Sequence, residues 1–177
     1  MSRLRFLAVV PLVGALSGAP LLGGAAGAAS GPVACNGTGS FGPSGPATSR
    51  SVGSDVIVSF PFDGVHPYCP APGGVDDVEA SIAGTLTEAI TAQGHFDLQF
   101  DETMTLPGGS GADQWRGEAS GTISNGLPVV SVSEVRTVGT GTGELANVVG
   151  HGSFQITGFG GYGLEFSDEI FYLYPGF

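Results

Sequence analysis

Apolar residues recur at every second position in several segments of this chain, and this alternation limits the fold more than any other feature. The clearest case is residues 95–104, where Phe96, Leu98 and Phe100 share one face and acidic or amide side chains occupy the other. A period of two is that of a β-strand with one buried face. No segment shows a comparable helical period, and 32 glycines among 177 residues would weaken a helix. The chain is therefore predicted to be all-β.

Turn-forming residues separate these segments at regular intervals. Short strands spaced in this way are typical of an antiparallel barrel or sandwich. We predict a single antiparallel β-barrel of about seven to eight strands, with a β-sandwich as the alternative. A proline-rich loop is expected at 61–74. The predicted strands are residues 55–60, 78–87, 95–104, 114–124, 128–138, 147–157 and 164–174.

The register of one hairpin follows from Asn125-Gly126, the residue pair that type I′ turns prefer. If the residues flanking this pair face each other, Trp115 lies opposite Arg136, and Glu134 falls in phase with the core valines of its strand. Trp115, Glu134 and Arg136 are then predicted to cluster at one end of the barrel interior. The cluster is either a structural ion pair covered by an aromatic ring or a polar anchor for a ligand. These three residues are our candidate ligand-binding site.

Residues 1–28 have the charged, apolar and small-residue order of a secretory signal peptide. Arg3 and Arg5 precede an apolar stretch, and small residues that suit cleavage end it. Two prolines in the stretch argue against a transmembrane helix, which needs about 20 uninterrupted apolar residues. A lipoprotein anchor at Cys35 is disfavoured, because this cysteine lies well past the apolar run and lacks a leucine three positions upstream. We predict a secreted, extracellular protein.

Beyond the signal, residues 29–54 are predicted to form a loose lead-in rich in Gly, Ser and Pro, and residues 55–177 the barrel domain. The chain has two cysteines, Cys35 and Cys69. An even cysteine count in an exported protein indicates a disulfide. There is no C-x-x-C motif and no histidine beside either cysteine, so nothing supports a metal site or a catalytic thiol.

The charge of the chain excludes several classes of partner. The chain has sixteen Asp and Glu residues and five Lys and Arg residues, which gives a net charge of −11. Removing residues 1–28 removes two arginines and leaves 3 − 16 = −13. Such a surface repels nucleic acid, and after signal cleavage it also repels anionic lipid headgroups. The acids are explained either by solubility alone or by binding of a basic partner or of divalent cations.

No motif in the chain predicts a catalytic residue, a metal or a cofactor. Two G-x-G-x-x-G matches, at 37–42 and 158–163, do not open a helix, and a phosphate cradle needs a helix N-terminus. The three histidines are scattered singly and are expected at the surface or in ordinary hydrogen bonds. The acids at 76–79 and Asp168-Glu169 are interpreted as solvated loop residues.

Residues 139–154 contain a glycine-rich turn, a Glu-Leu-Ala step and a G-x-G-x-F strand. This segment resembles the barrel repeat of allene oxide cyclase-like and dirigent-like proteins, and residues 118–123 fit the same pattern. The resemblance covers residues 78–174 and implies an antiparallel barrel of about eight strands. No catalytic residue of the plant cyclase matches a position here, so the resemblance implies no cyclase activity.

These observations predict an exported, non-catalytic barrel that acts as a binding or structural module and can hold a small apolar ligand. One alternative is a cyclase or isomerase acting on an apolar substrate inside the barrel. The other is a protein whose acidic surface binds a basic partner. An open cavity with two or more convergent polar groups would favour the cyclase or isomerase. A packed interior would leave the binding or structural module and the acidic surface-interaction protein. The oligomeric state and the identity of any ligand do not follow from the sequence.

Overall fold

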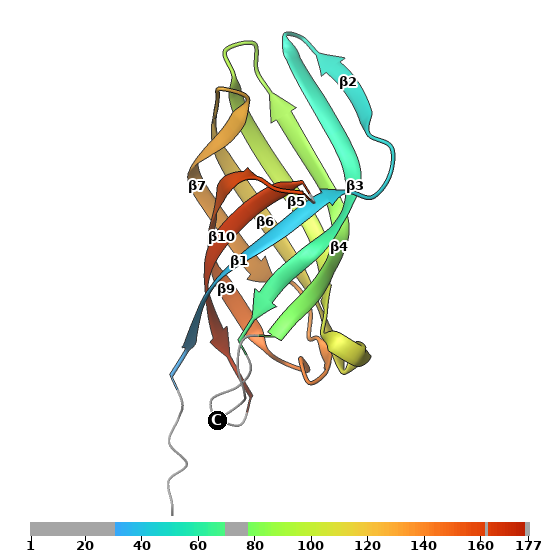
Figure 1. Ribbon diagram of the computed structural model, residues 1–177, viewed down its shortest axis with the longest axis vertical. Coiled ribbons are helices and arrows are strands. Elements are labelled where there is room, and N and C mark those ends of the chain that lie inside the picture. Colours follow the sequence, from blue (N-terminus) through green and yellow to red (C-terminus); the bar gives the residue numbers. More distant parts are fainter. Residues whose placement is uncertain (1–30, 70–77, 162, 176–177) are drawn as a thin grey trace, which may run out of the picture.

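The computed structural model describes residues 31–69, 78–161 and 163–175, which fold into an antiparallel β-barrel (Figure 1). The strands close in the order β1-β10-β9-β7-β6-β5-β4-β3, and β3 pairs again with β1. The predicted barrel is thereby confirmed, with eight strands in the wall and β2 and β8 outside it. The elements are β1 Val33–Pro43, β2 Thr48–Val52, β3 Asp55–Tyr68, β4 Val78–Ile90, β5 His95–Thr105, the 3₁₀ turn η1 Pro107–Gly109, β6 Gly111–Ser124, β7 Leu127–Thr137, β8 Thr142–Gly143, β9 Val149–Phe159 and β10 Leu164–Leu173.

The expected lead-in at 29–54 is wrong over residues 33–43, because these residues form β1 and complete the barrel wall. The strand pairs with β10 along most of its length and with β3 at its end. Its glycines suit this place: a Cβ at Gly39 would lie 2.3 Å from Cζ of Phe166. A composition poor in apolar side chains therefore marks close packing here and not disorder. The predicted signal peptide lies outside the described residues.

The predicted loop at 61–74 is also wrong in its first half, since β3 continues to Tyr68. Pro61 lies between the part of β3 that pairs with β2 and the part that pairs with β1, and Pro67 lies beyond both. Prolines are tolerated where a strand edge has no partner, because no ladder hydrogen bond is lost there. Residues 70–77 lie outside the described part of the chain.

The hairpin between β6 and β7 has the predicted turn. Asn125 and Gly126 have φ values of 53° and 80°, as a type I′ turn requires. The predicted pairing holds as far as Gly121 opposite Val130. Gly121 and Val130 lie close to the turn, so the Asn125-Gly126 pair determined the register from the turn to this point.

A β-bulge then shifts the register, and Ser120 pairs with Val132. One extra residue on a strand moves every later side chain to the other face of the sheet. Val132 is accordingly 67% exposed, whereas Val135 is 4% exposed and joins the core. The prediction that the inward phase of β7 continues unbroken from Val130 is wrong for this reason.

Strands β7 and β9 meet at a narrow seam with only two backbone pairs, at Val135 and Arg136. Beside them the hydroxyl of Ser133 donates to the carbonyl of Phe154 over 2.6 Å and accepts its N–H over 2.9 Å. A side chain thus replaces a backbone pair. This contact holds Phe154 in place, and the ring of that residue faces the barrel interior.

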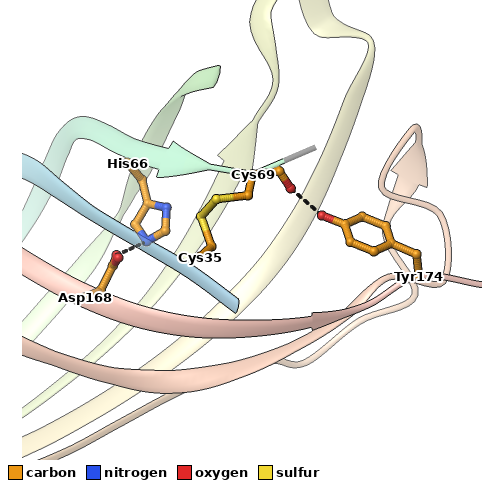
Figure 2. Close-up of a disulfide and its surroundings, with 5 residues drawn as sticks. All are labelled: Cys35, His66, Cys69, Asp168 and Tyr174. Atoms are coloured by element: carbon orange, nitrogen blue, oxygen red, sulfur yellow. Dashed lines mark hydrogen bonds and ion pairs between the residues drawn. A yellow bond between two sulfur atoms is a disulfide. The ribbon is translucent and has the colours of Figure 1, made fainter. Parts of the chain in front are cut away.

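Cys35 of β1 and Cys69, just after β3, form a disulfide with a Cα–Cα distance of 5.6 Å (Figure 2). The predicted disulfide is therefore confirmed. The hydroxyl of Tyr174 donates a hydrogen bond to the carbonyl of Cys69, so the end of the chain is tied to the same corner (Figure 2). Within the described ranges, no helix has the length and apolar character needed to cross a membrane.

Candidate functional site

Three ionisable side chains from three strands point into the barrel interior. His66 lies on β3, Glu102 on β5 and Asp168 on β10. Each occupies an inward position in the period-two pattern of its strand, and each is at most 8% exposed. Isolated buried charges cost several kcal/mol, so such groups persist where they are paired or used.

His66 and Asp168 form a buried pair, with Nε2 2.8 Å from Oδ2 (Figure 2). Burial lowers the pKa of His66, but the contact with Asp168 and the negative charges of Asp168 and Glu102 raise it by more. The Pro67 carbonyl adds to this upward shift, although Nδ1 forms no hydrogen bond of normal geometry. The net result is a pKa raised above 6.5, which favours an imidazolium paired with a carboxylate.

Glu102 is the third member of the group and has no hydrogen-bond partner among the described residues. Burial raises its pKa from 4.5 to about 7; the positive His66 opposes this shift and the negative Asp168 adds to it. Its neighbours across the sheet, Gly84 and Trp115, carry no charge. Glu102 can therefore exchange a proton near neutral pH while buried beside the His66–Asp168 pair.

These side chains line a cavity whose other walls are almost entirely apolar. The cavity has a volume of about 40 Å³, which is room for roughly three water molecules. It is partly open, so the terminal group of a longer molecule can also enter. Aliphatic side chains, including Leu98 and Val135, complete the lining. The aromatic walls are Phe41, Phe62, Phe100, Phe154 and Phe166, one each from β1, β3, β5, β9 and β10.

Trp115 contacts the polar group, with its ring centroid 6.4 Å from that of His66, and it packs against Tyr172 with centroids 5.8 Å apart. Both side chains are almost fully buried, and neither the indole N–H nor the hydroxyl has a hydrogen-bond partner in the described part of the chain. Burial, with the charge of Asp168 next, raises the pKa of Tyr172 well above 10. This residue is therefore a neutral hydrogen-bond donor at physiological pH.

Stability should fall as the pH rises from about 4.5 to 7, because the folded state holds the Glu102 proton over a range where the unfolded state has released it. The raised pKa of His66 also makes stability fall with rising pH, over a range that begins near 6.5. We expect Glu102→Gln to be more stable than the wild type at pH 8 by up to about 3 kcal/mol, and similar to it near pH 4.5. Urea unfolding across this range measures the difference. Glu118→Gln, on the exposed face, is the matched control, and equal slopes for both variants would contradict the assignment.

The structure does not bring the predicted site residues together. Trp115 lies inside the barrel, whereas Glu134 and Arg136 lie on its outer surface. Arg136 faces Arg116 across the sheet and Trp115 faces Thr137. The bulge in β7 is the cause, because it reverses the phase of the strand between the turn and these charges. The prediction of an interior cluster is therefore wrong.

The three residues that do converge were missed, although part of the signal was present. Glu102 continues the phase of Phe96, Leu98 and Phe100, and Asp168 shares its phase with Phe166. A charged residue in the apolar phase of a strand is a signal for an interior polar site. No group of three or more His, Cys, Asp or Glu among the described residues is arranged to hold a metal ion.

No model of a protein family matches this chain, and no curated protein matches it. The resemblance to allene oxide cyclase-like and dirigent-like proteins therefore gains no support from relatives. A crystal structure of a protein of unknown function from the DUF3224 family, from Shewanella oneidensis MR-1, is similar in fold. It shares 17% identity with this chain at a TM-score of 0.53, over 81% of this chain and 99% of its own. The chain thus shares its barrel fold with a DUF3224 protein.

Proposed function

We propose that this protein is exported and binds a small, largely apolar molecule inside its barrel without changing it chemically. The observation that supports the proposal is the convergence of His66, Glu102 and Asp168 on one phenylalanine-lined cavity. Sites for small molecules combine apolar walls with a few placed polar groups. A buried ionic group is seldom the most stable filling for a core, because apolar side chains of similar volume are often as good or better. Export is supported by the disulfide, which is common in oxidising compartments.

The size of the cavity limits what it can hold. Its volume of about 40 Å³ suits a molecule of a few heavy atoms or the end group of a longer one. The polar side chains then fix that end group, and the phenylalanine rings contact the apolar body.

Mass spectrometry of small molecules that co-purify with the mature protein tests the proposal. We expect a low-mass apolar compound with the wild type and none with Val135→Phe, whose added ring fills the cavity. Val132→Phe is the matched control, because it places the same ring on the outer face of the same strand. Equal recovery from both variants would place binding outside the cavity and overturn the proposal. No compound from the wild type, together with unchanged melting in a panel of small apolar compounds, would show that the barrel is a structural module.

A second candidate function is proton transfer to or from a ligand held in the cavity. It is favoured by one observation: Glu102, with a pKa of about 7, lies buried beside a His–Asp pair. Groups that titrate near the working pH are effective general acids and bases. A recovered ligand incubated with the protein in D₂O should then gain deuterium at carbon with the wild type and not with Glu102→Gln. A ligand that gains none with either protein excludes this candidate.

A further inference from the structure

The cavity holds one more acidic than basic side chain. His66 and Asp168 lie 2.8 Å apart and balance each other, and Glu102 has no fixed cation of its own. Resting on the proposed binding function, we propose that the ligand is a small organic cation, an alkyl amine whose ammonium group lies beside Glu102. The ammonium supplies the missing positive charge and the hydrogen-bond donors that this buried carboxyl lacks.

The walls of the cavity suit a positive charge. The five rings contact one another in a continuous row through space, in the order Phe154–Phe100–Phe62–Phe41–Phe166. The distances between successive ring centroids are 5.7, 6.3, 5.3 and 6.1 Å. The faces of aromatic rings attract cations, and the attraction is larger where water is excluded. An alkyl chain packs against the same rings, so one lining serves both the head and the body of an amine.

The charge of the whole protein acts in the same direction. The chain carries sixteen acids and five basic residues, and the resulting negative potential raises the local concentration of cations. An organic anion would meet two carboxyl groups in the cavity, Glu102 and Asp168, and only one imidazole. The site therefore selects against anionic ligands by repulsion.

Binding of a cation should strengthen as the pH rises toward neutral. The groups that act on Glu102 are His66 on β3 and Asp168 on β10, while its neighbours on β4 and β6 are uncharged. A cation prefers the ionised carboxyl, so its affinity should rise up to about tenfold per pH unit below the Glu102 pKa of about 7 and then level off. A neutral ligand that accepts a hydrogen bond from the protonated acid would show the opposite slope.

Hexylamine, hexanol and hexanoate provide the test, because they share one chain and differ in the charge of the head group. Calorimetric titration of the mature protein at pH 6 and pH 8 should rank hexylamine first. At pH 8 hexylamine should bind at least about tenfold tighter than hexanol, a difference of about 1.4 kcal/mol. Glu102→Gln should reduce hexylamine to the affinity of hexanol. Glu134→Gln, which removes an acid from the outer surface, should leave all three affinities unchanged.

Each other result has a defined meaning. Hexanol binding as tightly as hexylamine at both pH values, or hexanoate binding tightest, would overturn the cation inference and leave the proposed binding function intact. A loss of hexylamine affinity as large in Glu134→Gln as in Glu102→Gln would show attraction by the general negative surface, and would also overturn it. No binding by any of the three compounds would contradict the inference and the proposed function together.

Discussion

Asp168→Asn should destabilise the protein by about 3–5 kcal/mol at pH 5.5, because it leaves the buried His66 without its carboxylate. Burial alone disfavours the imidazolium, and Asp168 is the largest favourable influence that offsets this cost. At pH 8 the variant can keep His66 neutral, so the loss of stability should be smaller. Urea unfolding at the two pH values measures both losses.

The surface pair of Arg116 and Asp101 is the natural control for this experiment. Its atoms are 2.7 Å apart, a distance similar to that in the buried pair, but both side chains are more than half exposed. Exposed ion pairs contribute about 0–1 kcal/mol, so Asp101→Asn should have little effect at either pH. A double change, His66→Phe with Asp168→Leu, should recover much of the lost stability, since apolar pairs often replace buried ion pairs without loss. Equal losses for Asp168→Asn and Asp101→Asn would refute the buried-pair assignment.

Reduction of the Cys35–Cys69 disulfide should lower the free energy of unfolding by about 4 kcal/mol. The bridge spans 34 residues, and the chain-entropy model gives this value for a loop of that length. The loss should be felt at β1, which is rich in glycine and polar residues and holds few apolar side chains against the core. Because β1 joins β10 to β3, its release would open the barrel wall.

Urea unfolding with and without a reductant tests this expectation. The double variant Cys35→Ser with Cys69→Ser should have the stability of the reduced wild type and should not respond to reductant. Thiol titration of the denatured, unreduced wild type should find no free thiol. Two free thiols, or an unfolding midpoint that reductant does not change, would mean that the bridge is not formed in the protein.

Local patterns predicted most of the wall of the barrel. The alternation at 95–104 and the turn residues between strands identified an antiparallel barrel, and Asn125-Gly126 identified a type I′ turn. These features depend on residues that are adjacent in the chain or one turn apart, so the sequence alone determines them. The disulfide followed from a count of two cysteines, without knowledge of any geometry.

The interior site was decided by the tertiary structure. The bulge opposite Ser120 leaves no mark in the sequence, yet it moves Glu134 and Arg136 from the core to the surface. The alternation in its strand was enough to predict that Glu102 points inward. The charged groups nearest to it, however, come from strands that are far away in the sequence. Which charges meet across a barrel depends on how the strands are staggered when the sheet closes. A period of two shows only that a side chain points inward; the closure of the sheet placed Asp168 against His66 and left Glu102 beside them.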